Sequence, residues 1–524
     1  MVKKFNVTGT CIPVENYMVD ITEKLVQIKA MVDRREYFVI NRGRQYGKTT
    51  TLSELEKFLA DEYLVISISF EGFDLEEFQN AHTFGQVFLK RVHKALKFTD
   101  VEQAYRDSWL DEKINSFSQL GDHITDLCEN KKIVLMIDEV DKASNNRVFL
   151  GFLSKLREKF LAARSGKDFT FHSVILAGVT DIRNIKLKLT QEGLHAPTAS
   201  ETSTYNSPWN IASAFEVDMS FSVDEITKML QLYENDYQTG MKTNKVAQEI
   251  YNYTSGYPVL VSGICKNIDE KLNKDWTVVG VSKAVKLLLS ESGPLFDNLK
   301  KNLDMNVELS NFLYSIVILG ARRAFNTHNS LVELAAQYGY VAGGELGVEV
   351  SNRIFKTFLI DYYTEKALNE ANNKNLQGAI DNGGIVVNGE FNMDICLEKF
   401  SQYFQRYYSK KDERFIEREG RMLFLMFLSP ILNGQGFAYI EAQSPDGKRT
   451  DLIINYLAQQ FVVELKIWDG PKKHEEAVEQ LIGYLDQFQK NEGYLLTFDF
   501  RECKELKHEW VAIGDGRKNL DVVL

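Results

Sequence analysis

The sequence has little cysteine and no long apolar run. Its 524 residues include five cysteines, and none of them has the C-x-x-C spacing of a zinc or redox site. We therefore expect reduced thiols, no zinc and a cytoplasmic protein. The longest apolar run, Met422–Leu428, is broken by Ser429-Pro430 and is too short to cross a membrane. The opening Met1-Val-Lys-Lys also lacks the apolar core of a secretory signal.

Acidic residues outnumber basic residues in the sequence. Lys and Arg total 62 and Asp and Glu total 73, which gives a net charge of −11. Sequence-independent DNA binding normally depends on a basic face that neutralises phosphates, so the composition argues against a simple nucleic-acid binder. A groove near Lys448-Arg449, Lys466 and Lys472-Lys473 could still be basic locally. No internal repeat is present, and the length suggests roughly three or four domains of about 150 residues.

A phosphate-binding pattern stands near the N-terminus. Tyr37–Ile40 predicts a short buried strand and residues 52–59 predict a helix, with Asn41-Arg-Gly-Arg-Gln-Tyr-Gly47-Lys48-Thr49-Thr50 between them. At such a helix start the backbone N–H groups attract phosphate, the lysine reaches the β and γ phosphates of ATP, and the Thr49 hydroxyl can ligate Mg²⁺. The usual pattern has its first glycine where Arg42 stands, and here Gly43 follows one place later.

Two further strand ends carry polar residues that fit this site. Lys132–Ile137 is an apolar run that ends in Asp138-Glu139, and Ser173–Ala177 is another, followed by Thr180. In P-loop enzymes such an aspartate holds Mg²⁺ and the glutamate after it polarises the attacking water. A polar residue at the next strand end can sense the γ-phosphate. We therefore expect Lys48, Asp138 and Thr180 at the carboxyl edge of one parallel sheet. Taken singly, each could be a chance match or a helix cap.

In these features the chain resembles the AAA-ATPase-like group of ASCE P-loop proteins. The resemblance rests on the loop from Arg42 to Thr49 and on Tyr17-Met-Val-Asp20 before it, and it departs where Gly43 and Gln45 replace Pro and Arg. It implies an α/β P-loop ATPase core over residues 1–215. It also implies that ATP and Mg²⁺ are bound by Gly43, Gly47, Lys48, Thr49, Thr50, Asp138 and Thr180, with Thr49 and Asp138 at the metal.

Two helical segments are expected after the core. A helical lid over residues 216–300 opens with the capping box Ser222-Val-Asp-Glu225, and Thr254-Ser-Gly-Tyr-Pro258 separates two of its helices. A winged-helix-like connector over residues 301–390 contains strand-like pieces at 339–341 and 348–352. It shows no basic recognition helix, so a packing and motion-transmitting role is favoured over DNA binding. Asn372–Gly389, polar and with glycines, is the expected linker.

The C-terminal domain, residues 391–524, contains two predicted strands that bring acidic residues together. Asp451–Tyr456 and Gln460–Trp468 are rich in Ile and Val and are joined by a short turn, which predicts antiparallel neighbours. Because strand side chains alternate, Glu464 and Lys466 share one face, and the partner strand brings Asp451 beside Glu464. Two carboxylates suit Mg²⁺, and the lysine can orient water and stabilise charge on a phosphate.

A predicted helix over His474–Phe488 follows, with Gln480 and Tyr484 four residues apart on one side. Here the chain resembles the PD-(D/E)XK nuclease superfamily, which has a restriction-endonuclease-like α/β fold. The resemblance implies that Asp451 and Glu464 hold a metal, that Lys466 is catalytic with them, and that Gln480 and Tyr484 form the helix motif. GKRT precedes the aspartate where the superfamily has Pro. As an alternative, Glu-x-Lys is a frequent tripeptide at the end of a half-buried strand.

These features predict an ATP-binding and ATP-hydrolysing protein, with Glu139 as the water-polarising residue, that controls a Mg²⁺-dependent nuclease. Nucleic acid, above all DNA, is the expected partner, homo-oligomerisation stays open, and no membrane association is expected. The alternative is a nucleotide-dependent switch or scaffold whose nuclease-like domain only binds DNA or a protein partner. The acidic net charge favours this alternative, whereas the set of Asp451, Glu464 and Lys466 favours the nuclease.

The nuclease prediction can be tested by two alanine substitutions. Asp451→Ala and Glu464→Ala should each lose Mg²⁺-dependent cleavage while the chain stays folded, because these carboxylates would face a solvated metal cleft. Glu441→Ala, in the neighbouring strand-like FAYIEAQ, should matter less. Cleavage of DNA and RNA is the measurement. Activity that persists in both principal variants, or that resists EDTA in the unaltered protein, would mean that another site cleaves.

Overall fold

The chain folds into two compact units in the computed structural model. The structure describes residues 3–524 apart from residues 112, 144–145, 180–208, 292, 346, 371–382, 408–416, 433–435, 440–451, 458, 502–505 and 515. The first unit comprises residues 1–237, 256–262 and 336–339, and the second unit comprises residues 238–255, 263–335 and 340–524.

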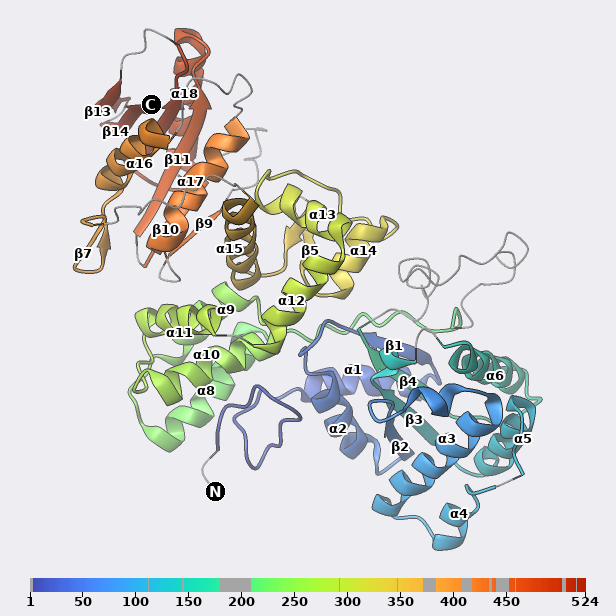
Figure 1. The fold of residues 1–524 in the computed structure, drawn as a ribbon. Helices are drawn as coiled ribbons and strands as arrows, with labels where there is room; N and C mark the ends of the chain where they lie inside the picture. The colour runs from blue at the N-terminus through green and yellow to red at the C-terminus, as the bar shows by residue number, and fades with distance from the viewer. Residues whose placement is uncertain are drawn as a thin grey trace, which may run out of the picture. The chain divides into compact units, whose positions relative to one another are not determined.

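A four-stranded parallel sheet forms the centre of the first unit (Figure 1). Its strands are β1 (Tyr37–Asn41), β2 (Leu64–Ser69), β3 (Ile133–Asp138) and β4 (Ser173–Gly178), in the order β1-β4-β3-β2. The three strands predicted from the sequence are thus confirmed, and they belong to one parallel sheet. Their side chains are almost all buried, as is usual for a parallel sheet that is covered on both faces.

Helices cover both faces of this sheet. One apolar cluster joins the sheet to α1 (Thr22–Asp33) and α2 (Lys48–Leu59), and another joins it to α3 (Ala81–Ala95), α5 (Phe117–Cys128) and α6 (Arg147–Arg164). The shorter elements are η1 (Leu75–Phe78), η2 (Leu96–Phe98), α4 (Gln103–Asp107) and η3 (Val140–Lys142). Helix α8 (Val223–Tyr237) opens with the predicted capping box, since Glu225 N–H donates to Ser222 Oγ and Ser222 N–H donates to Glu225 Oε2.

Helices dominate the next part of the chain. They are α9 (Thr243–Thr254), α10 (Pro258–Lys271), α11 (Val278–Ser290), α12 (Pro294–Met305), α13 (Val307–Val317), α14 (Ser330–Gln337) and α15 (Arg353–Glu370). The segment Thr254-Ser-Gly-Tyr-Pro258 separates α9 from α10, as predicted. Strands β5 (Val341–Gly344) and β6 (Gly347–Val350) form an antiparallel hairpin between α14 and α15. The strand-like pieces expected at residues 339–341 and 348–352 overlap these strands only in part, at Val341 and at residues 348–350.

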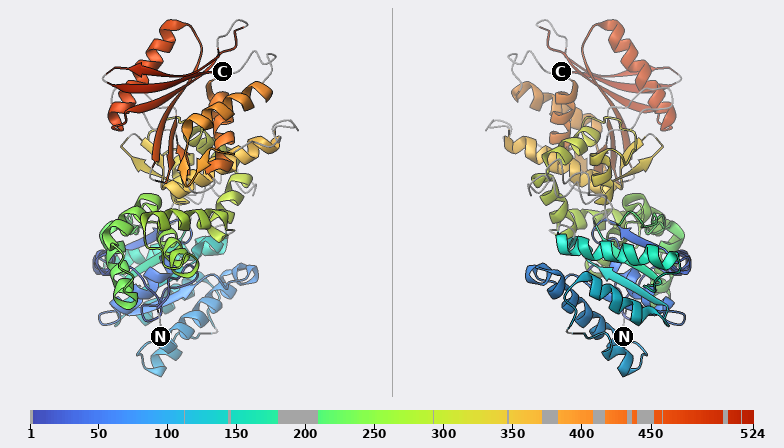
Figure 2. Two further views of the ribbon diagram at one scale, coloured as in Figure 1. Left: turned by 90° about the vertical axis from the view of Figure 1, so that its left-hand side faces the viewer. Right: turned by 90° about the vertical axis from the view of Figure 1, so that its right-hand side faces the viewer.

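A six-stranded mixed sheet forms the C-terminal part of the second unit. Its strands are β9 (Gly436–Tyr439), β10 (Leu452–Tyr456), β11 (Gln459–Ile467), β12 (Glu492–Phe498), β13 (Lys507–Ile513) and β14 (Arg517–Val523), in the order β13-β14-β12-β11-β10-β9. The predicted β10–β11 hairpin is confirmed, and β11, β12 and β14 run parallel. Helix α18 (Pro471–Gln487) lies along one face of the twisted sheet (Figure 2), and α16 (Met393–Tyr407) and α17 (Glu417–Leu432) precede the sheet in the chain.

The expected linker over Asn372–Gly389 is partly wrong. Its end forms a small hairpin of β7 (Val386–Val387) and β8 (Glu390–Phe391), with Asn388-Gly389 in the turn. Both turn residues have positive φ, at 53° and 83°, and Asn-Gly is the pair that such a two-residue turn favours. Phe391 N–H donates to Gln459 Oε1 at 2.7 Å, and its ring packs against Tyr456 and Phe461. The hairpin is therefore part of the C-terminal sheet domain.

No helix in the described ranges is both long enough and apolar enough to span a bilayer.

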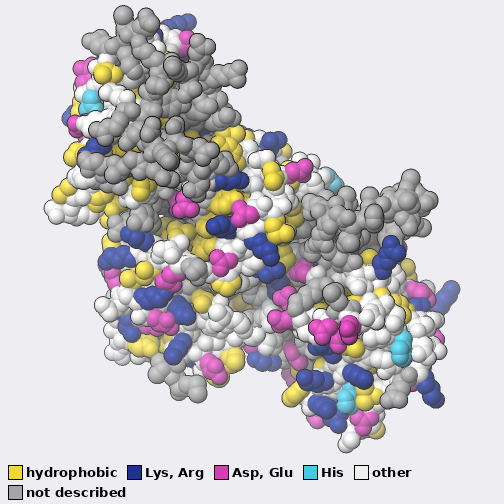
Figure 3. All heavy atoms as spheres, in the orientation of Figure 1, with side chains coloured by type: hydrophobic (Ala, Val, Ile, Leu, Met, Phe, Trp, Pro, Cys, Tyr) yellow, Lys and Arg dark blue, Asp and Glu magenta, His cyan; other side chains and the backbone are white. Residues whose placement is uncertain are grey.

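The described surface carries both signs of charge. On the face shown in Figure 3, Lys and Arg side chains are interspersed with Asp and Glu side chains.

One aspartate is partly buried between two helices of the second unit. Asp361 lies on α15, and the Ser429 hydroxyl of α17 donates to its Oδ1 at 3.1 Å. Burial raises the pKa of Asp361 to about 6, the Ser429 hydrogen bond opposes this rise, and the neighbouring charge of Glu365 adds to it.

We expect Asp361→Asn to stabilise the chain at about pH 8 and to change its stability little at about pH 4. The pKa of Asp361 is about 6 in the folded state and roughly 3.9 in the unfolded state. The protonated carboxyl therefore contributes its full stability below the unfolded-state pKa, and this contribution is lost as the pH rises through the folded-state pKa. A neutral amide should regain at most about 3 kcal/mol at high pH.

Thermal unfolding midpoints across this pH range measure the effect. Asp297→Asn provides the matched control, because Asp297 is an exposed aspartate on α12 of the same unit. An equal difference between Asp361→Asn and the unaltered protein at both pH values would contradict the prediction.

Candidate functional site

The loop between β1 and α2 holds a buried lysine. Lys48 is the first residue of α2 and only 8% exposed, and its Nζ donates to the carbonyl oxygens of Arg42 and Gly43, both at 2.9 Å. Gly47 has φ of 79°, which favours glycine at the turn into the helix. Burial lowers the pKa of Lys48, and the carboxylates of Asp141, Glu139 and Asp138 oppose this shift. The lysine is thus held at the helix start, where a phosphate would meet it.

Thr49 and Asp138 come together as predicted. The Thr49 hydroxyl donates to Asp138 Oδ2 at 2.7 Å, while Asp138 Oδ1 accepts a bond from the Glu139 N–H at 2.9 Å. Asp138 is the last residue of β3 and is 8% exposed. A hydroxyl and a carboxylate are hard oxygen ligands of the kind Mg²⁺ uses beside nucleotide phosphates, so this pair fits that ion.

Glu139 directly follows Asp138 in a left-handed backbone conformation, with φ of 56°. Burial is the largest cause of its raised pKa, and the carboxylates of Asp138 and Asp141 add to the shift, whereas Lys48 opposes it. Asp141 in turn accepts a hydrogen bond from the Val179 N–H at the end of β4. Thr180, the residue predicted to sense the γ-phosphate, lies outside the described residues.

The displaced glycine of the loop has a packing explanation. The Arg42 guanidinium donates to the Val217 carbonyl oxygen at 2.9 Å and lies over the Phe215 ring, so position 42 needs a long cationic side chain. A Cβ on Gly43 would come within 2.7 Å of the Tyr338 carbonyl oxygen. Glycine therefore stands at 43, where another part of the first unit approaches the backbone closely.

Tyr257, at the start of α10, also contacts the loop. Its hydroxyl donates to the Arg44 carbonyl oxygen at 2.7 Å, and its ring packs edge-on against Tyr46 with the centroids 4.5 Å apart. The backbone of the phosphate loop is thus contacted by Tyr257 and Tyr338, both of which come from segments that follow the sheet in the sequence.

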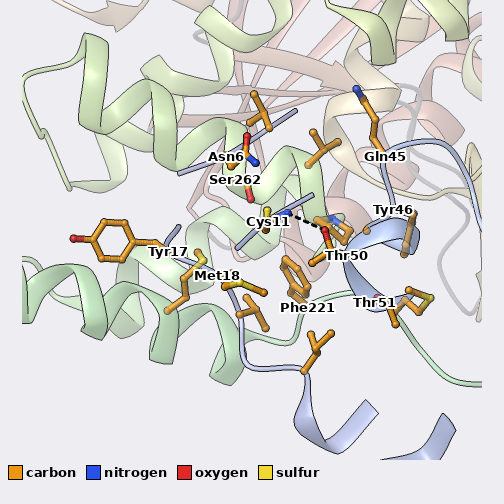
Figure 4. A pocket seen from close by; sticks show the side chains of 18 of the residues that line it. Asn6, Cys11, Tyr17, Met18, Gln45, Tyr46, Thr50, Thr51, Phe221 and Ser262 are labelled. Atoms are coloured by element: carbon orange, nitrogen blue, oxygen red, sulfur yellow. Dashed lines mark hydrogen bonds between the residues drawn. The ribbon is translucent and has the colours of Figure 1, made fainter. Parts of the chain in front are cut away.

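A cavity of about 280 Å³ opens beside the loop (Figure 4). Separate parts of the first unit line it: residues 6–28 near the N-terminus, the loop and first turn of α2, residues 219–229 into α8, and residues 258–262 at the start of α10. Most of the lining is apolar, as in Met18, Val19, Phe221 and Pro258. Thr50 faces this cavity and accepts a hydrogen bond from the Cys11 N–H at 3.1 Å. Sequence reasoning had named the loop residues and Tyr17–Val19, but it missed the cavity itself and lining residues such as Met219, Phe221 and Met229, because no spacing pattern connects them to the loop.

One wall of this cavity depends on a glycine. Gly256 has φ of 75°, its carbonyl oxygen accepts a bond from the Phe221 N–H at 2.8 Å, and a Cβ there would come within 2.1 Å of the Phe221 carbonyl oxygen. Phe221 lines the cavity, so the two backbones must touch for the wall to form.

The C-terminal sheet brings together three of its predicted site residues. Lys466 Nζ lies 2.8 Å from Glu464 Oε1 on β11, and Lys466 and Gln480 line a cavity of about 510 Å³. Tyr484 is instead buried in the apolar cluster under α18. Contrary to the expected solvated cleft, Glu464 is 0% exposed, because its neighbouring strands and α18 enclose that face.

Two acidic residues that sequence reasoning named there, Asp451 and Glu441, lie outside the described residues. Within the described parts of the chain, no three His, Cys, Asp or Glu side chains are grouped so as to hold a metal ion.

The parallel sheet, the loop with its buried lysine and the Thr49–Asp138 pair define a P-loop nucleotide-binding protein. The family profile described as an AAA-like domain matches residues 22–317, and the chain belongs to this family. No curated protein sequence matches the chain.

Several solved structures resemble the chain at low sequence identity. A Walker-type ATPase of Pyrococcus abyssi is 14% identical, with a TM-score of 0.46 over 68% of this chain and 99% of that one. The ORC2 protein of Aeropyrum pernix, in ADPNP and ADP complexes, is 11% identical, with a TM-score of 0.35 over 68% and 97%. The RuvB Holliday junction branch migration motor of Thermotoga maritima is 15% identical, with a TM-score of 0.31 over 64% and 94%.

We expect Gly256→Ala to destabilise the first unit more than Gly166→Ala does. Both glycines have positive φ, and an alanine in that conformation costs roughly 1–2 kcal/mol. Nothing lies within 4 Å of a Cβ at Gly166, whereas a Cβ at Gly256 overlaps the Phe221 backbone, which should add about 1–3 kcal/mol. Unfolding midpoints of the two variants make the comparison, and equal shifts would show that the close approach at Gly256 is not needed.

Proposed function

We propose that the chain binds and hydrolyses ATP, and that this cycle controls a Mg²⁺-dependent nuclease in its C-terminal domain. The observation that carries the ATPase part is the 2.7 Å bond between Thr49 and Asp138 beside the buried Lys48. A strand-end carboxylate, a hydroxyl at a helix start and the lysine directly before that hydroxyl are the groups that P-loop ATPases place around the phosphates.

Each residue of this site has a distinct role in the proposal. Lys48 binds the β and γ phosphates, together with the backbone N–H groups that begin α2. Thr49 and Asp138 hold Mg²⁺, which would neutralise charge on the phosphates. Glu139 accepts a proton from the attacking water, which its raised pKa favours. The apolar cavity beside Gly47 receives the base.

The nuclease part rests on the other end of the chain. Lys466 and Gln480 line one cavity, and Lys466 is paired with Glu464. In the proposal Glu464 and Asp451 hold the metal, while Lys466 and Gln480 orient the water and the phosphate. The full burial of Glu464 favours the alternative, in which this domain only binds DNA or a protein partner. Loss of Mg²⁺-dependent cleavage in the Glu464→Ala protein would support the nuclease over a domain that only binds.

Control of one site by the other is supported by contacts inside the first unit. Tyr257 directly precedes α10, Tyr338 lies three residues before the first residue of β5, and both contact the phosphate loop. A nucleotide that displaces Lys48 from the carbonyls of Arg42 and Gly43 would therefore disturb both residues. An effect of about 1–3 kcal/mol on DNA affinity would be typical of such coupling.

The ATPase proposal predicts different losses in two variants. Lys48→Ala should weaken ATP binding by about 100-fold or more, since it removes a buried, charge-assisted phosphate contact. Glu139→Gln should bind ATP normally and hydrolyse it roughly 100- to 10,000-fold more slowly, because it removes the base. Lys57→Ala is the matched control, because Lys57 is an exposed lysine of the same helix.

Nucleotide affinity and phosphate release are the measurements. Hydrolysis at the normal rate in Lys48→Ala would refute the assignment. Equal losses of binding in Glu139→Gln and Lys48→Ala would remove Glu139 from the chemical step.

A further inference from the structure

The face of the C-terminal sheet beneath α18 carries polar side chains besides Glu464 and Lys466, and the buried Asp521 has no role so far. The strand registers pair Glu464 with Leu495 and Leu495 with Asp521, and they pair Lys466 with Thr497. Residues paired across strands point to the same side of a sheet. Leu495 packs under α18, so all five residues share the face that this helix covers. Asp521 is 4% exposed, and its Oδ1 has no hydrogen-bond partner among the described residues.

A histidine on α18 is paired with this buried aspartate. His474 lies in the first turn of the helix, and its Nε2 is 3.3 Å from Asp521 Oδ2. The His474 ring also lies near the Trp468 ring, with the centroids 5.5 Å apart. Both His474 and Trp468 line the cavity that contains Lys466 and Gln480. One nitrogen of the ring is thus engaged by the carboxylate, and the imidazole borders the cavity.

Packing alone does not account for this pair. A buried carboxylate that keeps an oxygen without a partner is a net cost to folding, and an apolar residue of similar size would avoid it. A carboxylate that fixes an imidazole through one nitrogen leaves the other nitrogen free to meet a ligand, which is the usual arrangement of functional histidines. Asp521 and His474 have this arrangement at the edge of a cavity that already contains a lysine.

We propose that His474 is a phosphate-contacting residue of the C-terminal site and that Asp521 positions it. The ligand is a phosphodiester of nucleic acid, so the inference rests on the proposed function and adds a residue to its substrate site. Lys466 and His474 contact the phosphate from β11 and α18, and Asp521 keeps the imidazole ring in place. Asp469, Glu476 and Lys473 also border the cavity. The ammonium group of Lys473 is paired with Glu476 at 3.2 Å, so in the proposal the second contact to the phosphate, beside that of Lys466, comes from His474.

The salt dependence of nucleic-acid affinity tests this contact. Labelled single-stranded and duplex oligonucleotides are titrated with the full chain at about pH 6, with Ca²⁺ in place of Mg²⁺ to prevent cleavage. His474→Gln should lower the affinity about 10- to 100-fold and reduce the slope of log affinity against log salt by about one. His328→Gln, at an exposed histidine of the second unit, should change neither.

The role of Asp521 is tested by combining substitutions. Asp521→Asn should also lower the affinity for the oligonucleotide. The double variant Asp521→Asn/His474→Gln should bind with the same affinity as His474→Gln alone, because the aspartate acts only through the histidine. A merely structural role would instead lower affinity without a change of slope, and its effect would add to that of His474→Gln. Either result would overturn the inference.

Two further measurements keep this inference separate from the nuclease proposal. Mg²⁺-dependent cleavage by the unaltered protein and by Glu464→Ala tests the nuclease alone. Modification of His474 by diethyl pyrocarbonate, mapped by mass spectrometry with and without oligonucleotide, tests the contact whether or not cleavage occurs. Protection of His474 but not His328 supports the contact even in a protein that cleaves nothing. Equal labelling of His474 with and without oligonucleotide overturns it.

Discussion

The hydrogen bond between Thr49 and Asp138 is the constraint on which the first unit depends. Thr49 follows β1 and Asp138 ends β3, and β4 lies between these strands, so the two residues meet only if three parallel strands end at the same edge. Both faces of the strands must then be covered by helices, which is why their side chains are almost all apolar. A slip of one residue in β3 would turn Asp138 to the other face and leave both groups unmatched.

The phosphate loop is shaped as much by its neighbours as by the ligand it would hold. Arg42 is held by the Val217 carbonyl oxygen and the Phe215 ring. At Gly43 the absence of a side chain leaves room for the Tyr338 carbonyl oxygen. The close approach of the Tyr338 backbone therefore explains why the glycine stands at position 43. The same holds at Gly256, where the approach of Phe221 forms a wall of the adjacent cavity.

Local patterns predicted those parts of the molecule whose geometry is local. Apolar runs that end in Asp138 or Gly178 predicted strands, and the alternation of side chains placed Glu464 and Lys466 together. The apolar cavity could not be predicted, because its lining comes from three separate segments with no shared spacing. The His474–Asp521 pair depends on the order of β11, β12 and β14, which no pattern in the chain specifies. The burial of Glu464 likewise follows from α18 lying over its face and not from its own strand.

The β7–β8 hairpin bears on where the C-terminal domain can be separated from the rest of the chain. Gln459 exchanges two hydrogen bonds with the Phe391 backbone, and the Phe391 ring covers Tyr456 and Phe461. A fragment that begins after this hairpin would expose two aromatic rings and leave the Gln459 amide to water. An independently expressed domain must therefore begin upstream of Val386.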